Sequence, residues 1–467
     1  MLFAIDALDR QDRVALIEAG TGRSWTYRDL VKDVEYRRAS LAAPEPGLLF
    51  LFCRNDLASV AWYLAAVEAG HAVALLNARL DAGLKENLIS LYRPDWIGGV
   101  DSPANPPYRN GDDGLWRRDR TGELALFAGL SLLLSTSGST GSPKFVRLTR
   151  ANVESNAKSI VEALGITADD RPVAHLPLYY SYGLSVVNSH LLAGATIMLT
   201  DTGLITAEFW EAIRQHRVDS FSGVPYTYQM LRRLGLERLN VPLVRIMTQA
   251  GGKLDPGNIA FFSELIRKRG GGFWTMYGQT EATARISILP PHELPARLGS
   301  AGQAIPGGRL SILDDTGEYT AAAGVEGELV YEGPNVMMGY AFERADLGTG
   351  DELGGRLHTG DRAVLDDQGF VRILGRVKRD AKVFGLRMNL DEVEAFIRPN
   401  GPAAAVARDN SVMIFCEFGD PAQYSELRDE LSAKLRIHRS AFEFRRIEHL
   451  PTRDTGKIAY EALLDLL

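Results

Sequence analysis

The segment STSGSTGSPK, Ser135–Lys144, follows the apolar run LSLLL at 130–134 and precedes a helix expected at 151–163. Its small hydroxyl residues and two glycines let the backbone curve closely around phosphates, and Lys144 adds a positive charge. A flexible surface turn is the ordinary alternative for such a composition. A Walker loop is excluded, because G-x-x-x-x-G-K-[ST] occurs nowhere in the chain. The segment therefore predicts a phosphate-binding strand–loop–helix unit in an α/β protein.

Strand and helix signals alternate on both sides of this segment, which is typical of parallel sheets covered by helices. We expect strands at 47–53, 72–76, 130–134, 195–199 and 220–223, and helices at 56–70, 151–163, 208–215 and 227–234. From about Gly299 short strands and turns predict a small antiparallel β subdomain. The prediction is a multidomain α/β fold, with a large N-terminal domain at 1–377, β-rich from 299 to 377, and a small, mobile α+β C-terminal domain at 378–467.

The composition narrows the class of protein. The 467 residues are too many for one ordinary core, so two or more domains are expected. A formal net charge of −7 argues against a nucleic-acid binder, which needs a basic face. Two cysteines, Cys53 and Cys416, allow neither a disulfide framework nor a zinc cluster. The first residues do not resemble a signal peptide and no run of about 18 apolar residues occurs, so we expect a cytoplasmic protein without a membrane span.

Three further segments carry groups that suit a nucleotide. Tyr277–Thr283 (YGQTEAT) combines an aromatic ring, hydroxyls and a carboxylate, which fit adenine, a phosphate and Mg²⁺. His358–Asp361 (HTGD), with Gly375-Arg376 further on, offers a carboxylate and a guanidinium to a ribose. Pro451–Lys457 (PTRDTGK) places a lysine near the end of the chain. Each has a plain alternative when taken alone: a common turn, a hairpin turn with an exposed arginine, and a solvated tail lysine.

Together, in this order and spacing, these segments resemble the adenylate-forming superfamily, which includes acyl-CoA synthetases, adenylation domains of nonribosomal peptide synthetases and firefly luciferase. The resemblance runs from Trp25-Thr-Tyr to Gly456-Lys457 and covers almost the whole chain. It implies that a carboxylate attacks the α-phosphate of ATP, that pyrophosphate leaves, and that the acyl group passes to a thiol after the small domain rotates. Further matching segments are PLYYSYGL (177–184), GGKL (251–254), GEL (327–329), NVMMGY (335–340) and KVFGLR (382–387).

The resemblance also implies a role for each matching position. Residues that would hold the phosphates are Thr136, Ser137, Gly138, Ser139, Thr140, Gly141 and Lys144. Those that would act in catalysis are Lys457, Thr280 and Glu281, with Glu281 also binding Mg²⁺. Those that would hold adenine and ribose are Gly251, Gly252, Tyr277, Gly278, Asp361 and Arg376. Those that would line the acyl pocket are Tyr180, Ser181, Tyr182 and Val224. Lys378 matches the pivot and Gly385 the thiol tunnel, where a tight hairpin glycine is the plain alternative.

Two positions depart from relatives with known substrates. In relatives that activate amino acids an aspartate binds the α-ammonium group, and counting back from Gly194 without gaps places Ser181 there. An ammonium group without a counter-charge is unfavourable in such a pocket, so ordinary α-amino acids are disfavoured. Many acyl-CoA synthetases carry histidine where Tyr180 stands. Tyr180 therefore either alters how the acid or the thiol enters, or simply packs.

The expected function is that of an AMP-forming acyl-CoA synthetase, which uses ATP and Mg²⁺ to join a carboxylic acid to CoA. The nearest alternative is a stand-alone adenylation enzyme that loads the phosphopantetheine of an acyl carrier protein, or an amine. A third hypothesis is a non-catalytic nucleotide-binding relative. It predicts the loss of Lys457, Glu281 or Asp361, and all three are present. The sequence names neither the acid nor the oligomeric state.

Overall fold

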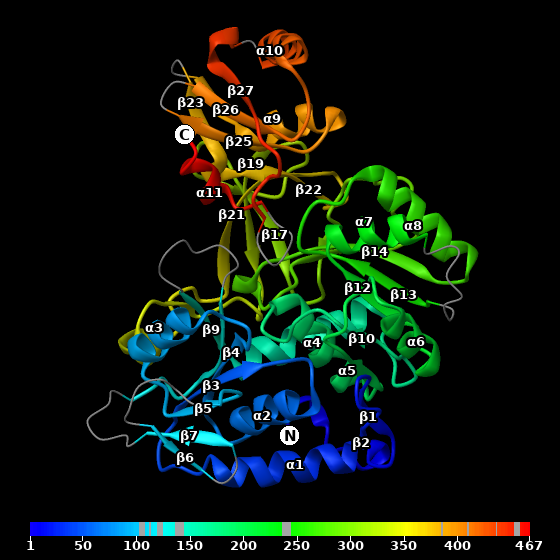
Figure 1. Ribbon diagram of the computed structural model, residues 1–467, viewed down its shortest axis with the longest axis vertical. Coiled ribbons are helices and arrows are strands. Elements are labelled where there is room, and N and C mark those ends of the chain that lie inside the picture. Colours follow the sequence, from blue (N-terminus) through cyan, green and yellow to red (C-terminus); the bar gives the residue numbers. More distant parts are fainter. Residues whose placement is uncertain are drawn as a thin grey trace. The chain divides into compact units, whose positions relative to one another are not determined.

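The computed structural model of the chain describes residues 1–101, 108–111, 114–118, 125–135, 144–235, 244–383, 386–408, 411–435, 437–452 and 458–467. At 378, 380–383, 386–387, 389 and 392 it describes the backbone alone. These residues form two compact units, which Figure 1 draws in colours that follow the sequence. The first unit comprises Met1–Arg309 and Tyr331–Leu357, and the second comprises Leu310–Val330 and His358–Leu467. The expected division into 1–377 and 378–467 stays a prediction.

An eight-stranded sheet forms one part of the first unit, in the order β20-β9-β8-β4-β3-β5-β7-β6. Its inner strands are parallel: β3 (Leu48–Cys53), β4 (Ala72–Asn77), β5 (Trp96–Gly98) and β8 (Leu130–Ser135). Antiparallel strands extend both edges: β9 (Phe145–Thr149), β20 (Gly339–Ala341), β7 (Leu115–Arg117) and β6 (Arg109–Asn110). Every residue of β3 is buried, as a continuous apolar run predicts for a strand covered on both faces.

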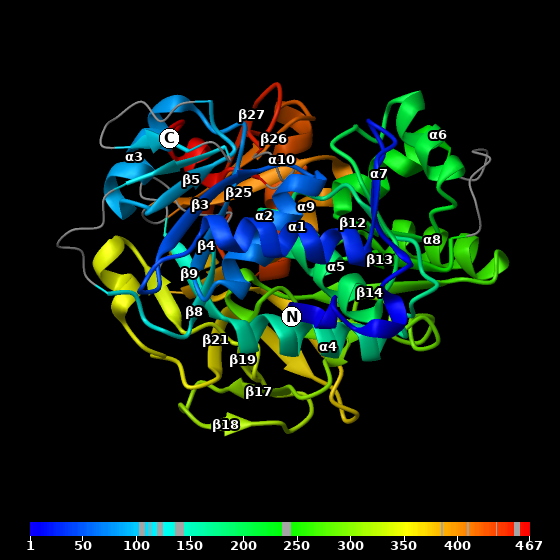
Figure 2. The same cartoon turned by 90° about the horizontal axis from the view of Figure 1, so that it is seen from below.

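Local capping decides where the helices beside this sheet begin. Thr26 and Asp29 form a capping box at the start of α1 (Tyr27–Ser40), and Asp56 accepts a hydrogen bond from the Ser59 N–H to start α2 (Leu57–Glu68). In Figure 2, α1 and α2 lie together; α2 packs on β3 and β4, and α1 packs on α2. Asp81 caps α3 (Ala82–Tyr92) in the same way.

A second sheet of the first unit has the order β12-β13-β14-β15-β16. The strands β12 (Ser220–Gly223), β13 (Ile246–Gln249) and β14 (Gly272–Tyr277) are parallel, and β15 (Ser287–Leu289) and β16 (Gln303–Ala304) are antiparallel. Their register pairs Gly223 with Gln249 and Gln249 with Thr275, so the carboxyl ends of the three parallel strands meet at one edge. The helices α6 (Ala207–Gln215), α7 (Pro225–Leu234) and α8 (Pro256–Lys268) belong to the same region, and α7 and α8 pack on this sheet.

Two packed helices adjoin this second sheet. The helix α4 (Arg150–Leu164) starts at a capping box of Thr149 and ends at Gly165, and α5 (Ser181–Ala193) ends at Gly194. Both glycines adopt left-handed backbone angles, which is the usual way to end a helix. A small sheet completes the unit, in the order β10 (Val173–Ala174), β11 (Ile197–Leu199), β1 (Val14–Glu18) and β2 (Ser24–Thr26).

The described residues of the second unit contribute to a five-stranded sheet, a three-stranded sheet, a two-stranded hairpin and three α-helices. The first sheet has the order β18 (Tyr319–Thr320), β17 (Arg309–Leu313), β19 (Glu326–Glu332), β21 (Arg356–Leu365) and β22 (Val371–Arg376). The second contains β25 (Ala403–Arg408), β26 (Ser411–Cys416) and β27 (Phe442–Arg446). Around it lie the hairpin β23 (Asp380–Val383) and β24 (Leu386–Asn389), and the helices α9 (Leu390–Ile397), α10 (Pro421–Leu435) and α11 (Tyr460–Leu464).

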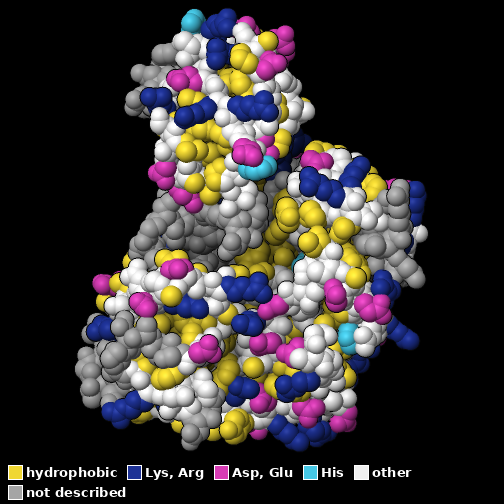
Figure 3. All heavy atoms as spheres, viewed as in Figure 1, with side chains coloured by type: hydrophobic (Ala, Val, Ile, Leu, Met, Phe, Trp, Pro, Cys, Tyr) yellow, Lys and Arg dark blue, Asp and Glu magenta, His cyan; other side chains and the backbone are white. Residues whose placement is uncertain are grey.

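These elements confirm the predicted fold class of parallel α/β sheets, an antiparallel β sheet and a C-terminal α/β part. The antiparallel edge strands of the eight-stranded sheet were not part of that prediction. Among the described residues, no helix is long and apolar enough to cross a membrane. On the face drawn in Figure 3, the side chains of Lys and Arg are interspersed with those of Asp and Glu on each unit.

Candidate functional site

The carboxyl edge of β12, β13 and β14 gathers residues that are far apart in the sequence. Val224 directly follows β12, Gly251 follows β13, and Tyr277 is the last residue of β14. Ligands of open α/β sheets bind outside the carboxyl ends of parallel strands, because the loops that can contact a ligand begin there. The predicted adenine and acyl positions of the first unit therefore lie at the edge where a site is expected.

Gly251 allows a close approach between two walls of this site. Its φ of 85° is left-handed, and a Cβ there would lie 2.5 Å from the Tyr180 hydroxyl and 3.1 Å from a methyl group of Val224. The Gln249 amide donates a hydrogen bond of 2.7 Å to the Gly252 carbonyl and holds the same loop. Burial raises the pKa of Tyr180 to about 12, so its phenol stays neutral at physiological pH.

A short turn after β14 carries Thr280 and Glu281. Thr280–Ala282 forms a single 3₁₀ turn, and Thr280 Oγ1 lies 3.2 Å from Ser181 Oγ at the start of α5. Gly278 is required before the turn, because a Cβ there would lie 1.8 Å from the Ala284 carbonyl oxygen. Thr283 has a φ of 56°, an uncommon backbone angle, and its hydroxyl donates a 2.6 Å hydrogen bond to the Asn335 carbonyl.

Tyr340 joins two of the predicted residues. Its hydroxyl donates to Glu281 Oε1 at 2.8 Å, and Lys144 Nζ lies 3.6 Å from the centre of its ring. The segment that ends in Tyr340 also holds the turn, since the Asn335 amide donates to the Ala282 carbonyl at 2.7 Å and the Met337 N–H donates to the Glu281 carbonyl at 2.9 Å. The sequence comparison singled out NVMMGY as a segment but assigned Tyr340 no role, because only the fold brings it to Glu281.

The chemistry of these groups fits Mg²⁺ that arrives with a nucleotide. Mg²⁺ is usually bound through one or two carboxylates together with substrate phosphates, and Glu281 supplies one carboxylate. In the described ranges, no group of three His, Cys, Asp or Glu side chains could hold a metal ion. Phosphate oxygens and water molecules could complete the coordination of Mg²⁺ at Glu281.

The predicted ribose pair lies in the second unit. Asp361 on β21 faces Arg376 on β22 in the register of the two strands, and Arg376 Nε lies 2.7 Å from Asp361 Oδ1. Asp361 is buried, whereas the Arg376 side chain is about half exposed. The pair therefore presents its guanidinium to solvent while the carboxylate is held by the protein.

Several predicted positions lie outside the described residues. They are Thr136, Ser137, Gly138, Ser139, Thr140, Gly141, Gly385 and Lys457. For Lys378 the structure describes the backbone alone, within the turn Val377–Arg379. The roles of these residues remain predictions.

Arg285 is a second residue to which the sequence assigned no role. It lies four positions after Glu281 and is 2% exposed. Its guanidinium stacks over the Tyr182 ring, 4.7 Å from the ring centre, and donates to Ser185 Oγ at 3.2 Å. An arginine after a turn motif reads as a solvated residue in sequence, and only packing places it beside the predicted acyl pocket.

Known proteins resemble the chain in both sequence and fold. Residues 129–341 match the family described as AMP-binding enzyme. Oxalate–CoA ligase of Arabidopsis thaliana is 32% identical over 272 residues, which are 57% of this chain and 52% of that protein. The 2-succinylbenzoate–CoA ligase of Bacillus pumilus is 28% identical over 392 residues, which are 78% of this chain and 75% of that protein. The chain thus spans about half the length of the first of these relatives.

A solved structure shows the same fold. O-succinylbenzoate coenzyme A synthetase from Bacillus subtilis, in complex with AMP, matches with a TM-score of 0.79 at 24% identity, covering 99% of this chain and 97% of that chain. The same enzyme has also been solved in complex with ATP and a magnesium ion. This likeness extends the resemblance from the AMP-binding segment to the fold of the whole chain.

Proposed function

The chain belongs to the AMP-binding, adenylate-forming enzyme superfamily, and on that premise we propose that it is an AMP-forming acid–thiol ligase of the acyl-CoA synthetase type. In the first step a carboxylate oxygen attacks the α-phosphorus of ATP, the bond to the bridging β-phosphate oxygen breaks, and pyrophosphate leaves acyl-AMP behind. In the second step the CoA sulfur attacks the acyl carbon, the bond to the AMP oxygen breaks, and the thiol proton is released. Both relatives described above are named CoA ligases of carboxylic acids, which supports this reaction.

The observation that carries the proposal is the cluster around the Thr280 turn. Thr280 lies against Ser181, and Tyr340 connects Glu281 with Lys144, so a hydroxyl pair, a carboxylate and an ammonium group converge within one unit. The reaction joins two anions, so positioning and charge stabilisation matter more than a strong general base. Mg²⁺ bound with the nucleotide would neutralise phosphate charge, while Thr280 and Lys144 are suited to donate to phosphate oxygens.

The remaining roles follow the family pattern. Gly251, Gly252, Tyr277 and Gly278 would hold adenine, with the glycine backbone on one side of the base and the aromatic ring on the other. Asp361 and Arg376 would hold the ribose. The loop Thr136–Gly141 would hold the β- and γ-phosphates, Lys457 would stabilise the transition state, Lys378 would act as the pivot, and Gly385 would line the thiol path.

The acyl side of the site suits an acid without an ammonium group. Its predicted lining consists of Tyr180, Ser181, Tyr182 and Val224, none of which carries a negative charge at neutral pH. Ser181, at the position predicted to face an α-ammonium group, is engaged with Thr280. An amino acid substrate would bring a positive charge to a site without a counter-charge on these residues.

Pyrophosphate release, measured against fatty, aryl, dicarboxylic and amino acids with and without CoA, tests the proposal. We expect turnover that depends on CoA for one class of acid. The Lys457→Ala variant, purified in parallel, controls for contaminating ATP-hydrolysing enzymes, because it should lose acid-dependent release.

The alternatives give different outcomes in the same assay. Pyrophosphate release that hydroxylamine stimulates and CoA does not would make a carrier protein or an amine the acceptor. If none of the acids in the panel causes pyrophosphate release, although the folded protein still binds ATP, the result would contradict catalysis and favour a nucleotide-binding protein.

A further inference from the structure

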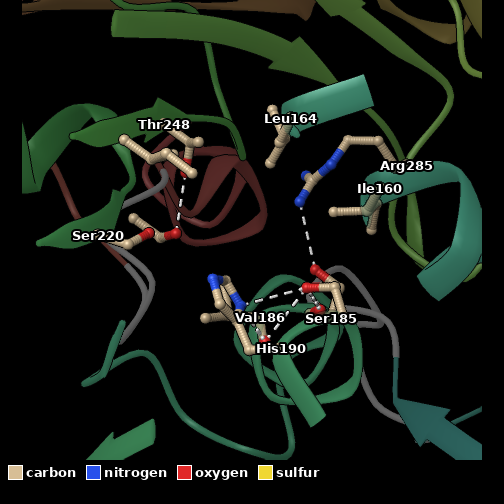
Figure 4. Close-up of a pocket in the computed structure, with 11 residues that line it drawn as sticks. Ile160, Leu164, Ser185, Val186, His190, Ser220, Thr248 and Arg285 are labelled. Atoms are coloured by element: carbon tan, nitrogen blue, oxygen red, sulfur yellow. Dashed lines mark hydrogen bonds between the residues drawn. The ribbon is translucent and has the colours of Figure 1, made fainter. Parts of the chain in front are cut away.

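A small cavity with both polar and apolar walls lies beside Arg285, between two helices and the second sheet of the first unit. Its lining residues are Ile160, Leu164, Ser185, Val186, Ser189, His190, Ser220, Ser222, Ile246, Thr248 and Arg285. Figure 4 shows the Arg285 side chain reaching into this space toward Ser185, with Ser220 and Thr248 on another side. Several hydroxyl groups therefore line the same cavity as the guanidinium of Arg285, which is 2% exposed.

Arg285 lacks the partner that a buried cation requires. Within the described parts of the chain no carboxylate forms an ion pair with it, its Nε has no hydrogen-bond partner, and one serine hydroxyl accepts from the guanidinium. Burial lowers the pKa of its guanidinium but leaves it charged, since an arginine keeps its proton in proteins. A water molecule could accept a hydrogen bond here, yet it brings no negative charge, and a buried cation needs one.

The helix α5 connects this cavity with the reacting end of the proposed site. Ser181, Ser185 and Ser189 are spaced by four residues and so share one face of the helix. Ser181 contacts Thr280, whereas Ser185 accepts from Arg285. At 1.5 Å per residue, the Arg285 contact lies about 6 Å further along the helix than the Thr280 contact.

Tyr182 follows Ser181 on α5 and contacts Arg285. Its ring lies under the Arg285 guanidinium, and its hydroxyl donates to the Thr248 carbonyl at 3.0 Å in the cavity wall. A chain of a few methylene groups that begins at Thr280 would pass this ring before it reaches Arg285. The ring is apolar on its faces and suits such a chain.

We propose that Arg285 binds a second carboxylate of the acid, so that the preferred substrates are dicarboxylic acids activated at the opposite end. This inference rests on the proposed function, because it names the substrate class of that same site. The distal carboxylate would accept hydrogen bonds from the guanidinium, including the unused Nε–H, and would supply the missing negative charge. Ser185 and its neighbouring hydroxyls would complete its hydrogen bonds.

Matched pairs of acids test the proposal. Succinic, glutaric, adipic and pimelic acids are each assayed for pyrophosphate release beside their monoamides, which keep the length and polarity but lack the second charge. We expect at least one diacid to exceed its monoamide in kcat/KM, and Arg285→Met to reduce that ratio by about 100-fold. Arg285→Lys should retain part of the preference. The proposal would be overturned if every monoamide had the same kcat/KM as its diacid in the wild-type protein. It would also be overturned if the ratio of diacid to monoamide kcat/KM were unchanged in Arg285→Met.

A matched control comes from another arginine stacked on an aromatic ring. Arg232 on α7 lies 4.3 Å from the ring centre of Phe261 and is exposed, so Arg232→Met removes the same group outside the cavity. It should leave the ratio of diacid to monoamide unchanged. An equal loss in both variants would make the effect of Arg285→Met non-specific and would overturn the assignment.

Binding separates this inference from the proposed function. Thermal melting with AMP present is measured with and without adipate and glutarate, for wild type and Arg285→Met. A rise in melting temperature with a diacid, absent with its monoamide and absent in the variant, supports the site even if no acid releases pyrophosphate and the proposed ligase activity fails. Pyrophosphate release with monocarboxylic acids alone, and no shift with any diacid, would leave the ligase intact and overturn the site.

Discussion

Two arginines stack on tyrosine rings, the buried Arg285 in the first unit and the partly buried Arg379 in the second, and they differ in their partners. Arg379 in the second unit lies 3.8 Å from the centre of the Tyr460 ring, pairs with Asp391 at 2.9 Å and Glu394 at 2.5 Å, and donates to the Ala405 carbonyl. Arg285 in the first unit stacks on Tyr182 and donates a hydrogen bond to Ser185, and no carboxylate of the described residues forms an ion pair with it.

The contrast separates an internal ion cluster from a binding group. Around Arg379 the protein supplies the negative charges itself, and Tyr460 donates to Glu394 at 2.9 Å, so the cluster ties α9, β25 and α11 together. Around Arg285 the corresponding charge has to come from elsewhere. A cation that is left without its counter-charge inside a folded protein is a candidate ligand site, because burial of such a group is otherwise unfavourable.

The largest expected effect comes from breaking the closed cluster. Glu394→Ala should lower the free energy of unfolding of the second unit by about 3 kcal/mol, because it removes a buried carboxylate and leaves the partly buried Arg379 with an incomplete set of partners. Urea unfolding followed by hydrogen exchange in β25 and β26 measures this. A loss below about 1 kcal/mol would show that Asp391 alone suffices and would weaken the contrast.

A smaller effect concerns His190, which lines the cavity beside Arg285. Burial lowers the pKa of His190 to about 4, below the value of about 6.5 expected in the unfolded chain. The unfolded chain therefore takes up the proton first. The contribution of neutral His190 to the free energy of unfolding is fully present above about pH 6.5. It falls by about 3 kcal/mol as the pH decreases toward 4.

Urea unfolding of wild type and His190→Gln from pH 7 to pH 4 measures this loss. The variant should show a shallower decline over that range, because its amide does not titrate. Parallel declines in the two proteins would assign the acid sensitivity to other groups and remove His190 from the comparison.

The smallest effect is expected at Arg285 itself. Arg285→Met should change the free energy of unfolding of the first unit by less than about 1 kcal/mol, or raise it, because an apolar side chain of similar length removes an uncompensated buried charge. The same denaturation experiment as for Glu394→Ala gives the comparison. A loss of more than about 3 kcal/mol would place Arg285 with Arg379 as a structural residue.

Much of the fold could be predicted because its signals are local. The expected strand at 47–53 and the expected helices at 56–70 and 151–163 agree within two residues at each end with β3, α2 and α4. The antiparallel edge strands of the eight-stranded sheet were harder to predict from the sequence. The strand Gly339–Ala341 pairs with Phe145–Thr149, and such long-range pairing leaves no periodic signal in either segment.

The segments that carry the candidate site residues could be predicted from the sequence, whereas most contacts between their side chains could not. Family resemblance pointed to Thr280, Glu281, Tyr180 and Gly251, and the structure brings Thr280 to Ser181 and Gly251 to Tyr180. Tyr340 was overlooked as a site residue because its partner Glu281 lies 59 positions away. Arg285 was overlooked because neither its burial nor its lack of a carboxylate can be read from neighbouring residues.

The sequence by itself determined much of the order of strands and helices, and it pointed to the segments that we propose to hold a nucleotide. These depend on periodicity, backbone freedom and hydrogen bonds between near neighbours, all of which a short window contains. The tertiary structure decided which groups meet: Tyr340 with Glu281 and Lys144, and Arg285 with Tyr182, Ser185 and a cavity. Burial and the distances between charges arise from packing of segments remote in the chain, and these determine whether an arginine has its counter-charge.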